Sequence, residues 1–441
     1  MNADDTSGTG HSRTRYTGTM IYATVSAAVV AVLFLSNWPT YQYEVRGGPI
    51  PLWFYVLPAV LIVPVMFAEP SASVRFMRDP MFWWFIVFVT TGLVWLLPAQ
   101  DFVEEASRQW RLRVLAFMFF YTVTILSSEA HRRVLGWVIV SCVLAACAFN
   151  WFDVLRPYRF VPQGIEGASD GRGAGLFINP NAAASFVVMG TIAALPMIPS
   201  RFRALLLVAA VFGVAATFSR SGFVLVAVTL IAALGVKLVS RSQRILLIVV
   251  LPLLIGGVSL SYDYLIDASD NRHMHNIVQR LAWFQERGEE DGAVEGRMYG
   301  AAQAWQLFLD SPVIGRGTGV TSLAVRQEGP HNMYLTLMAE QGVLGLTLYI
   351  SLFGILLRRG WRLAHSSTDA HGKDIGRTLM VFGVFLASYG FFSHNVLEEP
   401  HTMFVLAFIV AAGFHSTPIR RMPAAGLYAR SRPGTRLNSA A

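Results

Sequence analysis

The sequence predicts an all-α polytopic membrane protein with about twelve transmembrane helices. Of its 441 residues, 54% are hydrophobic and only 14% are charged, whereas a soluble domain carries roughly 25% charged residues. Apolar runs of about 20 residues recur along the chain, and each is long enough to cross about 30 Å of hydrocarbon. Helices are expected for these runs because a segment in lipid must satisfy its backbone groups internally.

The apolar runs place the predicted spans in order, with boundaries uncertain by several residues. By residue number the spans are 19–37, 50–68, 80–98, 112–127, 134–151, 181–198, 204–219, 222–237, 244–262, 332–357, 377–394 and 402–418. The chain therefore divides into five predicted parts: an N-terminal tail (1–18), helices one to nine (19–262), a long outer loop (263–331), helices ten to twelve (332–418) and a basic tail (419–441).

Basic residues follow the positive-inside rule along these spans. If the N-terminus lies inside, the inside segments hold 21 of the 35 Lys and Arg residues, while most outside connections are short and poorer in charge. This pattern predicts that both termini are cytoplasmic. It also accounts for most of the formal charge of +8, so the charge does not indicate a nucleic-acid partner.

Two outside segments are long, at about 151–180 and 263–330, and long connections often carry function. The second contains a stretch with apolar residues at helical spacing: Val294, Met298, Ala301, Trp305, Phe308 and Leu309. This stripe fits a helix that lies either on the membrane surface or on the helical bundle. The fold class is therefore an all-α bundle with a long, partly helical outer loop.

Arg220 is the first candidate site residue, in the sequence Thr217-Phe-Ser-Arg-Ser-Gly222. It lies 17 positions after Arg203 and 17 before Lys237, which is about 25 Å of helix on either side. We therefore expect Arg220 slightly below the outer membrane surface, where a charge is costly and tends to line a polar cavity. The structural alternative is an arginine that reaches to lipid headgroups.

Arg172 is the second candidate, in a glycine-rich segment that ends in Asn179-Pro-Asn181. The glycines permit close backbone approach, and the asparagines can cap the following helix. Arg172 would then meet an anion near that helix N-terminus. A plain structural turn with one surface arginine is the alternative.

His331-Asn332 lies at the outer start of span ten, and nine residues separate it from Gly342-Val-Leu-Gly345. Histidine is the side chain best suited to move protons near neutral pH, although a histidine at a helix start is often only a cap. Arg297 on the amphipathic stretch is a possible third anion contact. Glu340 should face a cavity or a partner, because a carboxylate is costly in lipid.

Several other features are weaker. The segment Gly315-Arg-Gly-Thr-Gly319 lacks the ending of a phosphate-binding loop and is interpreted as a turn. The polar patch around His394, Glu398, Glu399 and His401 is expected to support the site from outside it. Cys142 and Cys147 are expected to be free thiols, and no acidic cluster has metal-ligand spacing, so we predict no metal and no cofactor.

The sequence resembles the bacterial O-antigen ligase family, within the O-antigen ligase and polymerase superfamily. Its signature, a His followed by Asn, Ser or Gln, nine residues and a Gly-x-x-Gly pair, is matched by His331, Asn332, Gly342 and Gly345. The Ser219-Arg220-Ser-Gly222 element and the segment with Arg172, Asn179 and Asn181 are similar to two further family features.

The resemblance implies a GT-C-like glycosyltransferase of the bacterial inner membrane with a periplasmic active site. Its donor would be O-antigen polysaccharide on undecaprenyl diphosphate and its acceptor a sugar hydroxyl of lipid A-core, with inversion and without a metal, in lipopolysaccharide biosynthesis. His331 would be the base, and Arg220, Arg172 and Arg297 would bind the diphosphate. An O-antigen polymerase and a protein O-oligosaccharyltransferase are the alternatives. Charges gather at one face and not at the midplane, which disfavours a transporter.

Overall fold

The described part of the protein is built from helices. The computed structural model describes residues 8–49, 54–68, 70–127, 129–156, 158–162, 164–165, 172–245, 247–249, 292–324 and 329–415, and no strand occurs in these ranges. The α-helices are α1 (Gly8–Leu35), α2 (Trp38–Arg46), α3 (Val56–Ala68), α4 (Pro70–Phe76), α5 (Pro80–Val94), α6 (Val103–Leu126), α7 (Glu129–Leu155), α8 (Pro180–Ala194), α9 (Arg203–Ala215), α10 (Arg220–Gly235), α13 (Gly292–Asp310), α14 (Val320–Ala324), α15 (Met333–Ser366), α16 (Ala370–Tyr389) and α17 (Pro400–His415). Short 3-10 helices are η2 (Leu97–Phe102), η3 (Gly175–Phe177) and η4 (Ser200–Phe202).

Helices occupy the predicted spans that fall within the described residues. By length and composition, three described helices can cross a membrane: Gly18–Leu35, His131–Leu155 and Met333–Ser366. A fourth arises if the bent pair Pro80–Val94 and Leu97–Leu126 counts as one, and four shorter apolar helices accompany them. The fold is thus that of a multi-pass membrane protein. Most of the predicted span 244–262, the loop residues 263–291, the tail 419–441 and residues 1–7 lie outside the described residues.

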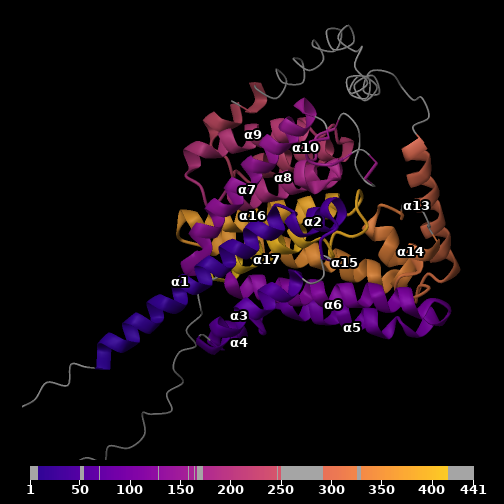
Figure 1. Cartoon of the computed structure of the whole chain (residues 1–441), viewed down its shortest axis with the longest axis horizontal. Coiled ribbons are helices and arrows are strands. Elements are labelled where there is room, and N and C mark those ends of the chain that lie inside the picture. The colour runs from indigo at the N-terminus through magenta and orange to yellow at the C-terminus, as the bar shows by residue number, and fades with distance from the viewer. Residues whose placement is uncertain are drawn as a thin grey trace, which may run out of the picture.

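The long hairpin of α15 and α16 and the buried helix α17 form the centre of the bundle, with α5 and α6 along one side and α7 to α10 on the other (Figure 1). Small residues allow the hairpin to close. A Cβ on Gly360 would lie 2.6 Å from the carbonyl oxygen of Gly376, so the two backbones are in direct contact, as is common between helices in membranes. Nearly every side chain from Met403 to Ala412 of α17 is fully buried.

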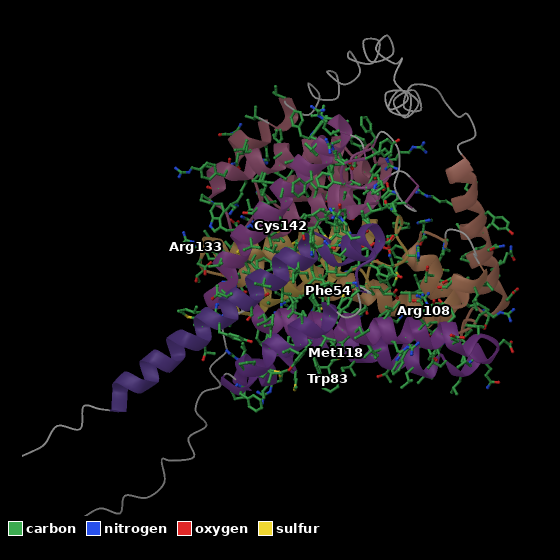
Figure 2. The ribbon with its side chains drawn as sticks, in the orientation of Figure 1. Phe54, Trp83, Arg108, Met118, Arg133 and Cys142 are labelled. Carbon is green, nitrogen blue, oxygen red and sulfur yellow. The ribbon has the colours of Figure 1, made fainter. Side chains whose placement is uncertain are left out.

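One end of the bundle is held together by basic residues. Arg203 pairs with Asp374 at 2.7 Å, and Arg359 pairs with Asp79 at 2.7 Å. These ion pairs join segments that the charge pattern places on the same, inner side of the membrane. Arg133 lies at this end of the molecule, and Arg108, from a segment predicted to be outside, lies at the other (Figure 2).

Helix α13 coincides with the predicted amphipathic stretch and crosses the far ends of α5, α6 and α15 in a direction roughly perpendicular to them (Figure 1). Ala304 is fully buried and packs in a small cluster with Ala339 of α15. The predicted apolar stripe faces outward instead, since Met298 and Trp305 are 69% and 42% exposed. The helix therefore packs on the bundle through Ala304 and Leu307 and leaves Met298, Trp305 and Leu309 exposed.

Candidate active site

The two predicted arginine elements lie against each other. The Arg172 guanidinium donates from Nε to the carbonyl oxygen of Thr217 at 2.9 Å and from Nη2 to Asn181 Oδ1 at 3.0 Å. Ser219 Oγ donates to the same Asn181 oxygen at 2.8 Å. Segments 45 residues apart are thus joined by one network of polar contacts.

Caps explain why these segments begin helices at this point. Asn179 precedes α8, and its side chain accepts a hydrogen bond from the backbone N–H of Asn181. Ser219 precedes α10, and its side chain accepts from the N–H of Gly222. Such caps satisfy donors that the first helical turn leaves without an intrahelical partner. Arg220 is therefore the first residue of α10 and is half-buried beside the Arg172 network.

His331 lies directly before α15 with its backbone in the left-handed region, at φ 43°. Asn332 caps the helix, because its side chain accepts from the N–H of Leu335 at 3.1 Å. The Met333 N–H donates to the carbonyl oxygen of Gly390 at 2.7 Å, which ties the start of α15 to the end of α16. Of the predicted pair, His331 is thus the side chain left for chemistry and Asn332 has a structural role.

The His331 ring is half-buried and meets the ring of His394 edge to face, with centroids 5.3 Å apart. Burial, followed by the charges of His394 and Arg297, lowers the pKa of His331 to about 4. Burial also lowers the pKa of His394. His331 is therefore neutral across the physiological range, in the form that accepts a proton. Arg297, exposed on α13, is close enough to act on this ring.

Of the predicted glycine pair, Gly342 breaks α15. Gly342 has φ 62° and ψ −150°, a non-helical conformation inside the helix. The break exposes backbone groups that the segment 312–319 satisfies: the N–H of Gly317 donates to the Glu340 carbonyl at 3.0 Å, and the N–H of Val343 donates to the Pro312 carbonyl at 2.9 Å. Gly345 allows close packing, since a Cβ there would lie 2.8 Å from Gln341 Cβ.

Glu340 has a partner inside the protein, as expected. Its carboxylate pairs with Arg113 of α6, and both side chains are almost fully buried. The other carboxylate oxygen accepts from the Gly319 N–H at 2.9 Å, and Arg113 also lies 3.7 Å from Glu398. The cluster joins α6, the broken helix α15 and the loop before α17 beneath the His331 region.

A second polar network joins Glu399 of the predicted patch to Ser185 and Tyr389, two residues that the sequence did not indicate. Ser185, one turn into α8, donates to Tyr389 Oη at 3.1 Å, and Tyr389 donates to Glu399 Oε2 at 2.8 Å. Tyr389 and Gly390 are neighbours at the end of α16. They therefore contact α8 on one side and the start of α15 on the other.

The predicted site residues thus form two groups that the end of α16 connects. Arg172, Asn181 and Ser219 are in contact, Arg220 lies beside them, and His331 and Arg297 form the second group. Among the residues that the structure describes, no group of three or more His, Cys, Asp or Glu side chains is placed to hold a metal ion.

Comparisons with known proteins agree with the motif analysis. No curated protein matches the chain significantly. Residues 205–350, however, match the model of a protein family described as O-antigen ligase. The match includes Arg220, Arg297 and His331, while Arg172 and Asn181 precede it. The resemblance to this family that the sequence predicts is confirmed over this range.

Proposed function

We propose that the protein is an O-antigen ligase that transfers O-antigen polysaccharide from undecaprenyl diphosphate to a sugar hydroxyl of lipid A-core. The observation that carries the proposal is that the Arg172 network at the start of α8 and α10 and the half-buried His331 before α15 are both linked to the end of α16, through Tyr389 and Gly390 respectively. A transfer from a diphosphate needs these two capacities, cationic groups for the leaving group and an acceptor for the proton of the attacking hydroxyl.

Arg220 and Arg172 would hold the diphosphate of the donor. Arginine remains charged and binds two phosphate oxygens at once through its planar fork. Arg172 is held in place by Thr217 and Asn181, so its orientation is set before a ligand arrives, which is the condition for effective electrostatic stabilisation. Arg297 approaches the site from α13 and would add a third positive charge. These arginines would supply the stabilisation that a divalent cation gives in other transferases.

His331 would act as the base. The acceptor hydroxyl oxygen attacks the anomeric carbon from the face opposite the diphosphate, so that the new glycosidic bond forms as the bond from carbon to phosphate oxygen breaks. The hydroxyl proton passes to the imidazole nitrogen, and undecaprenyl diphosphate departs with the bonding electrons. The negative diphosphate would also raise the pKa of His331 when the donor binds, which strengthens the base in the complex.

The proposed topology completes this picture. We propose twelve spans in a GT-C-like arrangement in the bacterial inner membrane, with both termini in the cytoplasm. The basic end, which contains Arg203 and Arg359, would then be cytoplasmic, and the end with Arg220 and His331 would face the periplasm, where α13 lies on the membrane surface. Donor and acceptor lipids would both reach this end from the membrane.

An in vitro transfer assay tests the proposal. Purified protein is mixed with undecaprenyl-diphosphate-linked glycan and lipid A-core, with EDTA throughout. His331→Ala is compared with His365→Ala, which removes an exposed histidine from the far end of the same helix. We expect product from the wild type and from His365→Ala, and a loss of about 10²–10⁴ for His331→Ala.

Replacing the acceptor separates the alternatives. Product only with a second lipid-linked glycan would identify a polymerase, and product only with a protein acceptor would identify a protein O-oligosaccharyltransferase. Activity that EDTA removes and Mn²⁺ restores would refute the metal-independent mechanism. Equal transfer rates for His331→Ala and His365→Ala would show that His331 is not the base.

A further inference from the structure

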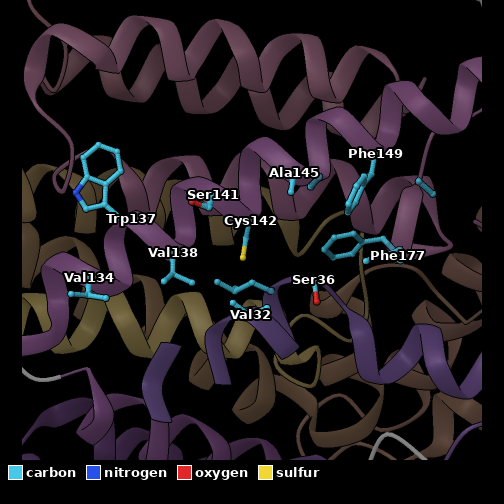
Figure 3. A pocket seen from close by; sticks show the side chains of 14 residues that line it. Val32, Ser36, Val134, Trp137, Val138, Ser141, Cys142, Ala145, Phe149 and Phe177 are labelled. Carbon is cyan, nitrogen blue, oxygen red and sulfur yellow. The ribbon is translucent and has the colours of Figure 1, made fainter. Parts of the chain in front are cut away.

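An apolar groove runs along the bundle between α1 and α7 and encloses a cavity of about 500 Å³. Trp137 and Val134 lie at one end, Phe149 and Phe177 at the other, and Cys142 faces the space between the helices (Figure 3). The remaining lining residues are mostly small or apolar: Val32, Leu35, Ser36, Val138, Ser141, Ala145, Ala146, Ala174 and Leu176. No charged side chain lines it.

The outer end of the groove belongs to the same short segment that carries the arginine site. Ala174, Leu176 and Phe177 line the groove, whereas Arg172 and Asn181 at the two ends of this segment form the polar network described above. The turn is fixed in position because Asp153 of α7 accepts from the N–H groups of Ala174 and Gly175 at 3.1 and 3.2 Å. The apolar groove thus ends at the segment that carries Arg172.

The dimensions and lining define the chemistry of an occupant. From Val134 to Phe149 the groove follows 15 residues of α7, or about 22 Å at 1.5 Å per residue, which is most of the hydrocarbon thickness of about 30 Å. At the inner end α1 and α7 are tied by a hydrogen bond between Thr24 and His131. The space therefore suits one long apolar chain whose anionic head lies at Arg172.

We propose that this groove binds the polyprenyl chain of the lipid-linked donor. The inference rests on the proposed function, which requires a diphosphate at the arginines and therefore an apolar chain that starts beside them. Ordinary membrane lipid could fill a groove on the bundle surface, but it would not require that the groove ends at the segment that carries Arg172. The small side chains Ala145, Ala146 and Ala174 leave the width that a methyl-branched chain needs.

Two matched substitutions on α7 test the inference. Ala145→Trp places an indole in the groove, whereas Ala148→Trp makes the same change three residues away, at an exposed position that does not line the groove. The affinity of the purified full-length protein is measured for undecaprenyl diphosphate and for inorganic diphosphate, which has the head but no chain. Transfer to lipid A-core is measured in parallel.

We expect Ala145→Trp to weaken undecaprenyl diphosphate binding by at least about tenfold, because contact with several methylene groups is lost, and to leave inorganic diphosphate binding unchanged. That unchanged binding also shows that the variant is folded. Ala148→Trp should bind both ligands as the wild type does. A milder Ala145→Leu variant should fall between them.

Unchanged undecaprenyl diphosphate affinity in Ala145→Trp, or an equal loss in both tryptophan variants, overturns the assignment. So does equally tight competition by phosphatidylglycerol. These failures are distinct from failure of the proposed function. If the wild type transfers glycan but Ala145→Trp binds undecaprenyl diphosphate normally, the proposed function stands and the groove assignment is wrong. If binding depends on the groove but no acceptor receives glycan, the groove assignment stands and the proposed function is wrong.

Discussion

Replacement of Gly342 by alanine tests the interpretation that this residue breaks α15 for a structural reason. Its backbone, at φ 62° and ψ −150°, lies in a region that side chains rarely adopt, and occupying it costs about 1–3 kcal/mol. A Cβ would also lie 2.6 Å from the Pro312 carbonyl oxygen, which accepts the hydrogen bond of Val343. Loss of that bond adds about 1 kcal/mol, for a total of about 2–4 kcal/mol.

The effect can be measured as a melting temperature. At about 2.1 cal/mol/K per residue over 441 residues, a loss of 2–4 kcal/mol lowers the melting temperature by about 2–4 °C. Thermal unfolding in detergent, followed by circular dichroism, gives this value for Gly342→Ala. The matched control is Gly354→Ala in the same helix, where a Cβ would meet no atom within 4 Å. Alanine should be neutral or stabilise there by about 0.5–1 kcal/mol. Equal melting temperatures for the two variants would refute the reasoning.

Three further variants test other parts of the site. Glu340→Gln removes one of the two carboxylates that face the buried Arg113 and leaves Glu398 as the other. The free energy of unfolding should therefore fall by up to about 3–5 kcal/mol, and an unchanged melting temperature would contradict this. Arg220→Gln should lower kcat/KM for transfer by about 10²–10³, whereas Arg156→Gln, at an exposed position, should not. Arg297→Gln removes a positive charge that lowers the pKa of His331, so the acid limb of the profile of kcat/KM against pH should move to higher pH. Burial and His394 still lower the pKa of His331 in this variant, so the limb should stay below 6.5, the ordinary pKa of histidine. A limb that does not move would show that the charge of Arg297 does not act on His331.

The positions of the helices could be predicted from hydropathy, but their ends could not. Helix α6 begins at Val103, nine residues before the predicted span at 112, and the added stretch contains Glu104, Glu105 and Arg108, which hydropathy treats as unfavourable in a membrane. Part of this stretch has a partner distant in sequence, since Gln109 donates to Ser322 Oγ at 3.1 Å. Helix α15 likewise continues beyond 357 to Ser366, where Arg359 pairs with Asp79. Partners distant in sequence decide these ends.

The candidate site could be predicted where its signals are local. Asn179, Ser219 and Asn332 are helix caps, and capping depends on residues within one turn, so the sequence shows where these helices begin. The contribution of Tyr389 and Glu399 could not be foreseen, because it depends on contacts with Ser185 that only the packing of α8 against α16 creates. Their nearness to His394 in the sequence was visible, but a polar patch alone does not indicate its partners.

The directions of the helices at the end of the bundle that carries the candidate site explain why the site uses arginines. Helices α8, α10 and α15 all begin here, and their positive dipole ends favour an anion. In each of them, however, the cap already accepts a hydrogen bond from one first-turn N–H group: Asn179 from Asn181, Ser219 from Gly222 and Asn332 from Leu335.

The helix ends therefore offer a diffuse positive field with fewer free donors than uncapped termini would. A diphosphate that departs with new charge needs strong, directed donors at short range, and side-chain guanidinium groups can provide them where these capped N–H groups cannot. For this reason, substitution of Arg220 should impair transfer far more than it impairs folding, whereas removal of a cap such as Asn332 should do the reverse.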